Sequence, residues 1–222
     1  VYLYTGFVPK TITKLYLLGK GRLDCAYVTE LETDFLTVKT TPRLIWKGAS
    51  NLPDNPARGH AFFEASSMRK FGSMYYFIYS SEQNHELCYA TSETPTGPFR
   101  FGGTIVSNAD IGFEGRTSKA ALNYYGNNHG SMVRINDDHY VFYHRQTNRH
   151  EYSRQACAEH VRMESDGSIA QVEMTSCGLN GGPLAGTGTY SAHIACNLFS
   201  RQGTGSYSPL NVWKSFRKHP YL

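Results

Sequence analysis

The sequence lacks the features that would place the chain in a membrane or on a nucleic acid. No apolar run approaches the roughly 18 residues of a membrane-spanning helix. The 22 Lys and Arg are scattered among 18 Asp and Glu, with no basic block, and the net charge is only +4. The chain therefore has no electrostatic footprint for nucleic acid. We expect neither a membrane nor a nucleic-acid partner, and a neutral ligand fits the composition better.

The sequence also lacks the cysteine spacing of a disulfide framework or a zinc site. Its five cysteines are an odd number with wide, irregular separations, and no Cys-x-x-Cys pair occurs. Buried free thiols in a reducing compartment are the expected state. No charged-then-apolar segment opens the chain as a signal peptide would. From the odd number of free-type cysteines we expect a cytoplasmic rather than a secreted protein. The cysteines are Cys25, Cys88, Cys157, Cys177 and Cys196.

Aromatic residues and glycine, by contrast, are abundant. The 222 residues include 16 Tyr, 12 Phe and 21 Gly. Aromatic side chains suit a half-buried pleated surface, and glycine supplies the positive φ of tight turns. The length allows one large domain or two small ones, either with a substantial core. The composition predicts an all-β fold.

Short strand-like runs separated by turn signals extend along the chain. Two successive units share one order: a small or polar inner strand, a turn, an aromatic-rich strand, and a strand leading to glycine. This order is typical of a β-propeller, and a β-sandwich is the alternative. A WD-type interaction propeller is disfavoured because no Trp-Asp repeat is present. Strands are predicted at residues 1–4, 26–32, 44–46, 66–68, 75–79, 86–92, 126–134, 139–144, 155–161, 169–174 and 191–198. A short edge strand is also predicted within 96–101, after the Gly97-Pro98 turn.

One carboxylate, Glu64, stands among apolar and small residues directly before a strand-like run. Apolar neighbours such as Phe62 and Phe63 would withdraw water from it and raise its pKa toward the range of a general acid. The alternative is a structural ion pair with Arg69 or Lys70. This stretch alone leaves both interpretations open.

His129 and Arg154 are two further candidates, because inner strands of a propeller all face its central channel. His129 stands between Asn128 and Gly130, whose small bulk suits the close approach of a ligand or ion. The alternative for His129 is a structural histidine. For Arg154 it is a surface ion pair with Glu151 or Glu159.

Several motifs, in order along the chain, resemble those of glycoside hydrolase family 43. They are Phe63-Glu64-Ala65-Ser66-Ser67-Met68-Arg69-Lys70, Tyr89-Ala90-Thr91-Ser92 with Gly97-Pro98-Phe99, Asn127-Asn128-His129-Gly130-Ser131, Tyr140-Val141-Phe142-Tyr143-His144-Arg145, and Ser153-Arg154-Gln155. The resemblance covers roughly residues 1–184. It is closest to the α-L-arabinofuranosidase and β-xylosidase members, which implies a five-bladed β-propeller and hydrolysis with inversion of arabinose or xylose units in plant cell-wall polysaccharides or their oligosaccharides.

The resemblance also implies roles for individual residues. Glu64 falls at the position of the general acid, and Arg154 where an arginine contacts the sugar. His129 falls where a histidine lies near the channel, often beside a calcium ion, which it would contact through water. Phe63 and Asn128 are further substrate-binding candidates.

The sequence departs from the family pattern at the general base. The aspartates that serve as base and as modulator of the acid belong to the first blade and the start of the second, and neither is found here. Asp34 is interpreted as a turn residue. Residues 1–222 are therefore expected to form one incomplete propeller domain of about three to four blades, with the last strands and a C-terminal tail at 178–222.

Two expectations follow from that departure. The chain alone should be inactive as a glycosidase, because an acid without its base loses one of two proton transfers. It should also be unstable or self-associate, since an open propeller exposes sheet faces. The alternative function is a non-catalytic carbohydrate-binding propeller that lacks the base.

Overall fold

The described fold consists of strands and three short 3-10 turns, which confirms the all-β prediction. A computed structural model describes residues 1–6, 25–48, 54–121, 125–146, 154–175, 177–180 and 185–190. The predicted strand at 191–198 and the C-terminal tail lie outside these ranges. Within them, no helix has the length and apolar character to cross a membrane.

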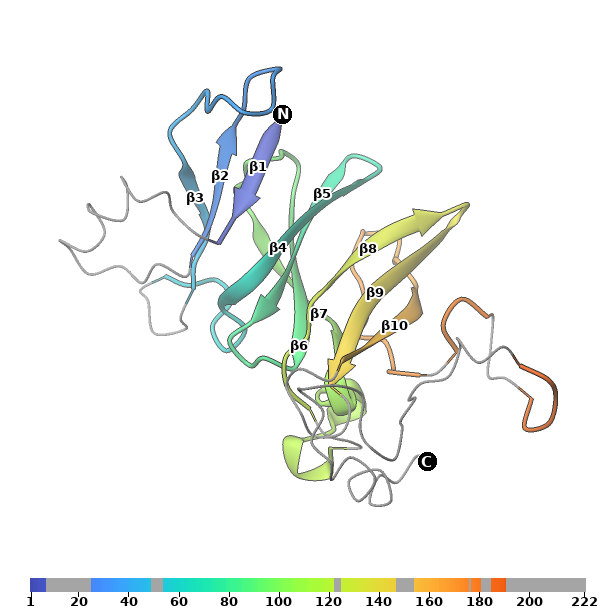
Figure 1. Ribbon diagram of the computed structural model, residues 1–222. Helices are drawn as coiled ribbons and strands as arrows, with labels where there is room; N and C mark the ends of the chain where they lie inside the picture. The colour runs from blue at the N-terminus through green and yellow to red at the C-terminus, as the bar shows by residue number, and fades with distance from the viewer. Residues whose placement is uncertain are drawn as a thin grey trace, which may run out of the picture.

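Three antiparallel sheets lie side by side, with the four-stranded sheet in the middle (Figure 1). The first sheet has the order β1-β2-β3, the second β4-β5-β6-β7, and the third β10-β9-β8. The strands are β1 (Tyr2–Thr5), β2 (Ala26–Glu30), β3 (Arg43–Trp46), β4 (Phe62–Phe71), β5 (Met74–Ser81), β6 (Glu86–Ser92), β7 (Arg100–Ser107), β8 (Gly130–Ile135), β9 (Asp138–Gln146) and β10 (Arg154–Val161).

The second sheet is apolar on both faces because it packs between the other two. On β5, Phe77 and Tyr79 join a core cluster with Trp46 of the first sheet. Alternate residues of the same strand, including Ile78, join a second cluster with Met132 of the third sheet. The period-two alternation of a strand thus sends neighbouring side chains into two different cores. This explains the continuous apolar run of β5.

The predicted strands agree with the structure in place and differ in extent. β6 and β9 lie where the alternation predicts them, and β4 and β5 form the predicted hairpin. Residues 126–129 precede β8 and are not in a strand, while residues 169–174 form isolated bridges instead of a full strand.

The segment that follows β10 returns to the second sheet. The Val172 amide donates to the Ile105 carbonyl at 2.8 Å, and the Ile169 amide donates to the Tyr89 hydroxyl at 2.8 Å. The Tyr76 hydroxyl donates to the Gly167 carbonyl at 2.9 Å. We call residues 167–174 the return segment. Its hydrogen bonds connect the chain that leaves the third sheet to strands β5, β6 and β7 of the second sheet.

Candidate active site

Glu64 lies in β4 between two irregularities of strand pairing. The register with β5 shifts between Phe62 and Glu64 and again between Glu64 and Ser67. Ala65, inside the second shift, has a φ of 63°, a left-handed conformation that non-glycine residues adopt at a cost. Such bulges reorient a side chain out of the regular alternation. Glu64 is thereby separated from its neighbour Phe62, which is buried in the core.

The carboxylate of Glu64 contacts His129, which lies where the chain enters the third sheet. His129 Nε2 lies 2.5 Å from Glu64 Oε1, and the two side chains keep 35% and 39% of their surface exposed. His129 directly precedes β8, so the contact spans the second and third sheets. A hydroxyl pair beside it, Ser67 Oγ and Ser131 Oγ at 2.7 Å, joins the same two strands. The carboxylate is therefore held in place and still reachable from solvent.

The structure does not support the ion pair between Glu64 and the basic residues of its own strand. The Arg69 guanidinium donates to the Met132 carbonyl at 2.8 Å, and the Lys70 ammonium lies 5.1 Å from the centre of the Tyr75 ring. Both cations have other partners, and the partner of Glu64 is His129.

A second histidine, His144 on β9, connects His129 to Arg154. The rings of His129 and His144 meet edge to face at 5.4 Å, and Arg154 Nη1 lies 3.4 Å from His144 Nε2. Burial, with the positive charge of Arg154 and the nearby His129, lowers the pKa of His144 to about 4. His144 is therefore neutral near pH 7 and can accept a hydrogen bond from the guanidinium.

Glu64, His129 and Arg154 thus lie on one continuous line of contacts, with His144 as the link. Sequence reasoning did not single out His144, although it stands in the motif Tyr140-Val141-Phe142-Tyr143-His144-Arg145. On β9 it is paired opposite Ala156 of β10, which brings it close to Arg154 at the start of β10. Of the two suggested partners of Arg154, Glu159 is instead bonded by Tyr143 and Thr175, and Glu151 lies outside the described residues.

The two remaining candidates differ in exposure. Phe63 is 44% exposed and next to Glu64, so it is available to a ligand. Asn128 is fully buried, which differs from its predicted contact with substrate. Its amide donates to the His85 carbonyl at 3.3 Å, and its own carbonyl accepts a hydrogen bond from Ser80. In this structure Asn128 fixes the chain just before His129.

The predicted turn role of Asp34 is confirmed. Its Oδ1 accepts hydrogen bonds from the Leu36 and Thr37 amides at 2.9 and 2.8 Å, and its Oδ2 accepts one from the Thr37 hydroxyl at 2.5 Å. These bonds lower the pKa of Asp34, first of all the one from the Thr37 hydroxyl. The carboxylate is occupied by its own turn. Asp24 lies outside the described residues.

The surroundings of His129 do not fit direct calcium binding. Calcium takes six to eight oxygen ligands. Within the ranges that the structure describes, no group of three or more His, Cys, Asp or Glu ligands includes His129. The Nε2 atom of His129 is already in contact with the Glu64 carboxylate.

Comparison with known proteins places this geometry in context. The family model described as Glycosyl hydrolases family 43 matches residues 10–169. A "Xylosidase/arabinosidase" from Thermoclostridium stercorarium is 50% identical over 199 residues, which are 89% of this chain and 40% of the relative. A "Beta-xylosidase" from Xylanibacter ruminicola is 51% identical over 47 residues, 21% of this chain and 15% of the relative.

Solved structures share the fold. A β-xylosidase/α-arabinofuranosidase of family 43 from a compost metagenome, in complex with xylotriose and described as a calcium-free form, has a TM-score of 0.58 at 22% identity, over 77% of this chain and 53% of that one. A family 43 enzyme from Xanthomonas citri has a TM-score of 0.57 at 21% identity, over 77% and 52%. The chain thus spans about half the length of these structures and 40% of the first relative.

Proposed function

Because the chain belongs to glycosyl hydrolase family 43, we propose that it carries the acid side of an inverting active site that removes arabinofuranosyl or xylosyl units from plant cell-wall polysaccharides or their oligosaccharides. The observation that carries this proposal is the Glu64 carboxyl, accessible to solvent and held at 2.5 Å by His129 between two strand bulges. The names of the relatives support the sugar class.

Glu64 is the group that donates the proton. The protonated Oε2 of Glu64 gives its proton to the glycosidic oxygen as the bond from that oxygen to the anomeric carbon breaks. A base on the opposite face of the sugar takes a proton from water, whose oxygen forms the new bond to the anomeric carbon. Base and acid in inverting enzymes are about 6.5–9.5 Å apart, which leaves room for that water.

His129 positions the acid. The Nε2–H group of His129 donates to Glu64 Oε1, which leaves Oε2 to carry the transferable proton. Arg154, which contacts neutral His144, would donate to sugar hydroxyls, and exposed Phe63 would pack against a sugar face. Calcium would act near His129 only through water; because the described residues do not form its coordination shell, no step depends on it.

The test is Glu64→Gln in a chain long enough to span its relatives. Glutamine keeps the shape and removes the transferable proton, so kcat on substrates with poor leaving groups should fall by about 10²–10⁴. Substrates with good leaving groups need little protonation and should lose much less. The high-pH limb of the rate profile should disappear.

The matched control is Glu114→Gln, which changes an exposed glutamate of the loop before β8. It should leave kcat on both kinds of substrate unchanged. Equal losses on both substrate kinds with an unchanged pH profile would make Glu64 structural. Binding of xylo-oligosaccharides by the unmutated protein without any turnover would instead support the non-catalytic carbohydrate-binding function.

A further inference from the structure

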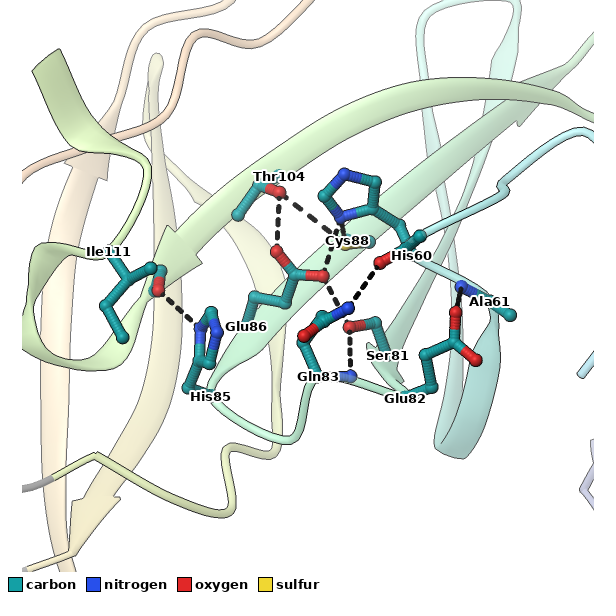
Figure 2. A network of polar contacts seen from close by, with 12 residues as sticks. His60, Ala61, Ser81, Glu82, Gln83, His85, Glu86, Cys88, Thr104 and Ile111 are labelled. Atoms are coloured by element: carbon teal, nitrogen blue, oxygen red, sulfur yellow. Dashed lines mark hydrogen bonds and ion pairs between the residues drawn. The ribbon is translucent and has the colours of Figure 1, made fainter. Parts of the chain in front are cut away.

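A group of polar side chains lies apart from the acid, on the face of the second sheet toward the first sheet. Glu86 and Cys88 are two residues apart on β6, so their side chains lie on the same face. Cys88 belongs to the cluster with Trp46. His60, which precedes β4, reaches the same point, where Figure 2 shows its ring beside the carboxylate and the thiol. Glu64, by contrast, contacts the entry to the third sheet.

The side-chain atoms of the three residues that could bind a metal ion are close together. His60 Nδ1 lies 2.7 Å from Glu86 Oε1 and 4.0 Å from Cys88 Sγ. All three atoms lie within 4.8 Å of one another, and no other set of three His, Cys, Asp or Glu among the described residues comes as close. A tetrahedral zinc ion with bonds of about 2.0–2.3 Å separates its ligand atoms by roughly 3.3–3.8 Å. Shifts of about 1 Å or less would bring the three atoms to these separations.

Charge and burial also favour a cation at this point. Glu86 is 4% exposed and Cys88 is fully buried. Among the described residues, the ion-pair partner of Glu86 is His60 alone, and neither lysine nor arginine contacts it. A divalent cation at this buried point would compensate the charges of the carboxylate and of a coordinating thiolate.

We propose that His60, Glu86 and Cys88 form a binding site for a thiophilic divalent metal ion, with Zn²⁺ as the best match. Imidazole, carboxylate and thiolate are all zinc ligands, and thiolate disfavours calcium and magnesium. Ser81 and Thr104, which hydrogen-bond Glu86 at 2.5 and 3.1 Å, orient the carboxylate as outer partners. The ion enters from the side of His60, whose side chain is 39% exposed, whereas the other two are buried.

Bound metal would fix the chain just before the acid. His60 is the residue from which the chain enters β4, and its ring stacks on Phe101 at 5.2 Å. Coordination would tie this entry to β6 across the sheet. The site is therefore structural and lies outside the reacting atoms.

Cobalt is a direct probe for this site. Protein freed of metal by a chelator and then given Co²⁺ should show a near-ultraviolet thiolate-to-cobalt charge-transfer band with one ion bound per chain. The band should be lost in Cys88→Ser and retained in Cys157→Ser, which changes a half-buried cysteine of β10. Zn²⁺ at equal concentration should raise the melting temperature of the unmutated protein and of Cys157→Ser, but not of Cys88→Ser.

A second variant keeps the test valid if Cys88→Ser does not fold. His60→Phe preserves the aromatic stacking on Phe101 and removes the ligand nitrogen, so its Co²⁺ affinity should fall at least tenfold. The proposal is wrong if the unmutated protein shows no charge-transfer band. It is also wrong if the band persists in folded Cys88→Ser, or if folded His60→Phe binds Co²⁺ with unchanged affinity.

Discussion

At the scale of single residues, the contacts that connect His129 to Arg154 depend on an uncharged His144. His144 lies between His129 and Arg154, and its burial beside them lowers its pKa to about 4. A charged imidazole at this position would repel the guanidinium and withdraw the lone pair that faces it. Neutral His144 is thus a condition for the line of contacts that ends at Glu64.

The lowered pKa of His144 predicts a loss of stability in mild acid. In the unfolded chain this histidine binds a proton near pH 6.5, whereas in the folded chain it does so only near pH 4. Because the unfolded state binds more protons between these values, the free energy of unfolding should fall as the pH drops from about 6.5 to about 4, by at most about 3 kcal/mol. Denaturant unfolding at a series of pH values measures this.

The variant His144→Gln cannot titrate and should show a smaller fall over the same pH range. His160→Gln serves as the control, because His160 is an exposed histidine on neighbouring β10. A pH dependence that is the same in all three proteins would show that His144 does not contribute.

Sequence reasoning singled out Glu64, His129 and Arg154 as candidates because their motifs could be recognised from local residues. It did not find His144 or the burial of Asn128, because both depend on which strand lies across the sheet from which. The expected dehydration of Glu64 by its aromatic neighbours depends on side-chain direction as well. Phe62 enters the core while Phe63 is 44% exposed, and the bulges that decide this leave no clear pattern in the sequence.

At the scale of elements, the start of β8 determines the position of His129. Gly130 has no side chain, and a Cβ built there would lie 2.2 Å from the Phe142 carbonyl oxygen and 2.7 Å from Leu87 Cδ1. The first of these neighbours is backbone and cannot rotate away. Glycine here allows β8 to pack closely against β9 and against the second sheet.

Gly130→Ala should therefore displace the start of β8 and with it His129. We expect a loss of stability of about 1–3 kcal/mol from overpacking. In the version extended to the length of its relatives we also expect a fall in kcat, because His129 would no longer hold Glu64 at 2.5 Å. Thermal unfolding and kinetics measure the two effects. Gly186→Ala is the matched control, since a Cβ there meets nothing within 4 Å. Full stability and activity in Gly130→Ala would show that the strand can adjust.

At the scale of the whole molecule, the proposed reaction needs two carboxyl groups on opposite faces of the sugar. Residues 1–222 are predicted to give no measurable hydrolysis of aryl arabinosides or xylosides on their own, because the sequence has no aspartate at the position of the family's base. Asp34 is bound in its own turn. Assays of this chain beside a version extended to the length of its relatives test the prediction. Turnover by residues 1–222 at the rate of the extended version would contradict it.

The overall class could be predicted from composition and alternation, whereas the packing of the sheets could not. Both faces of β5 are apolar, so its sequence does not say which face meets which neighbour. The number of blades and the closure of a propeller stay predictions. A strand was predicted at residues 169–174, but their pairing with the second sheet was not, because the partner of a strand depends on how the sheets pack.

The return segment has a consequence for the order in which the chain can fold during its synthesis. The strands of the second sheet end at Ser107, but Tyr89 and Ile105 acquire their partners only from Ile169 and Val172. The second sheet therefore leaves the ribosome some sixty residues before the segment that completes it, with buried groups still unpaired. At about 5–20 residues per second this is a delay of several seconds, during which the β7 edge is open to wrong pairing and to chaperones.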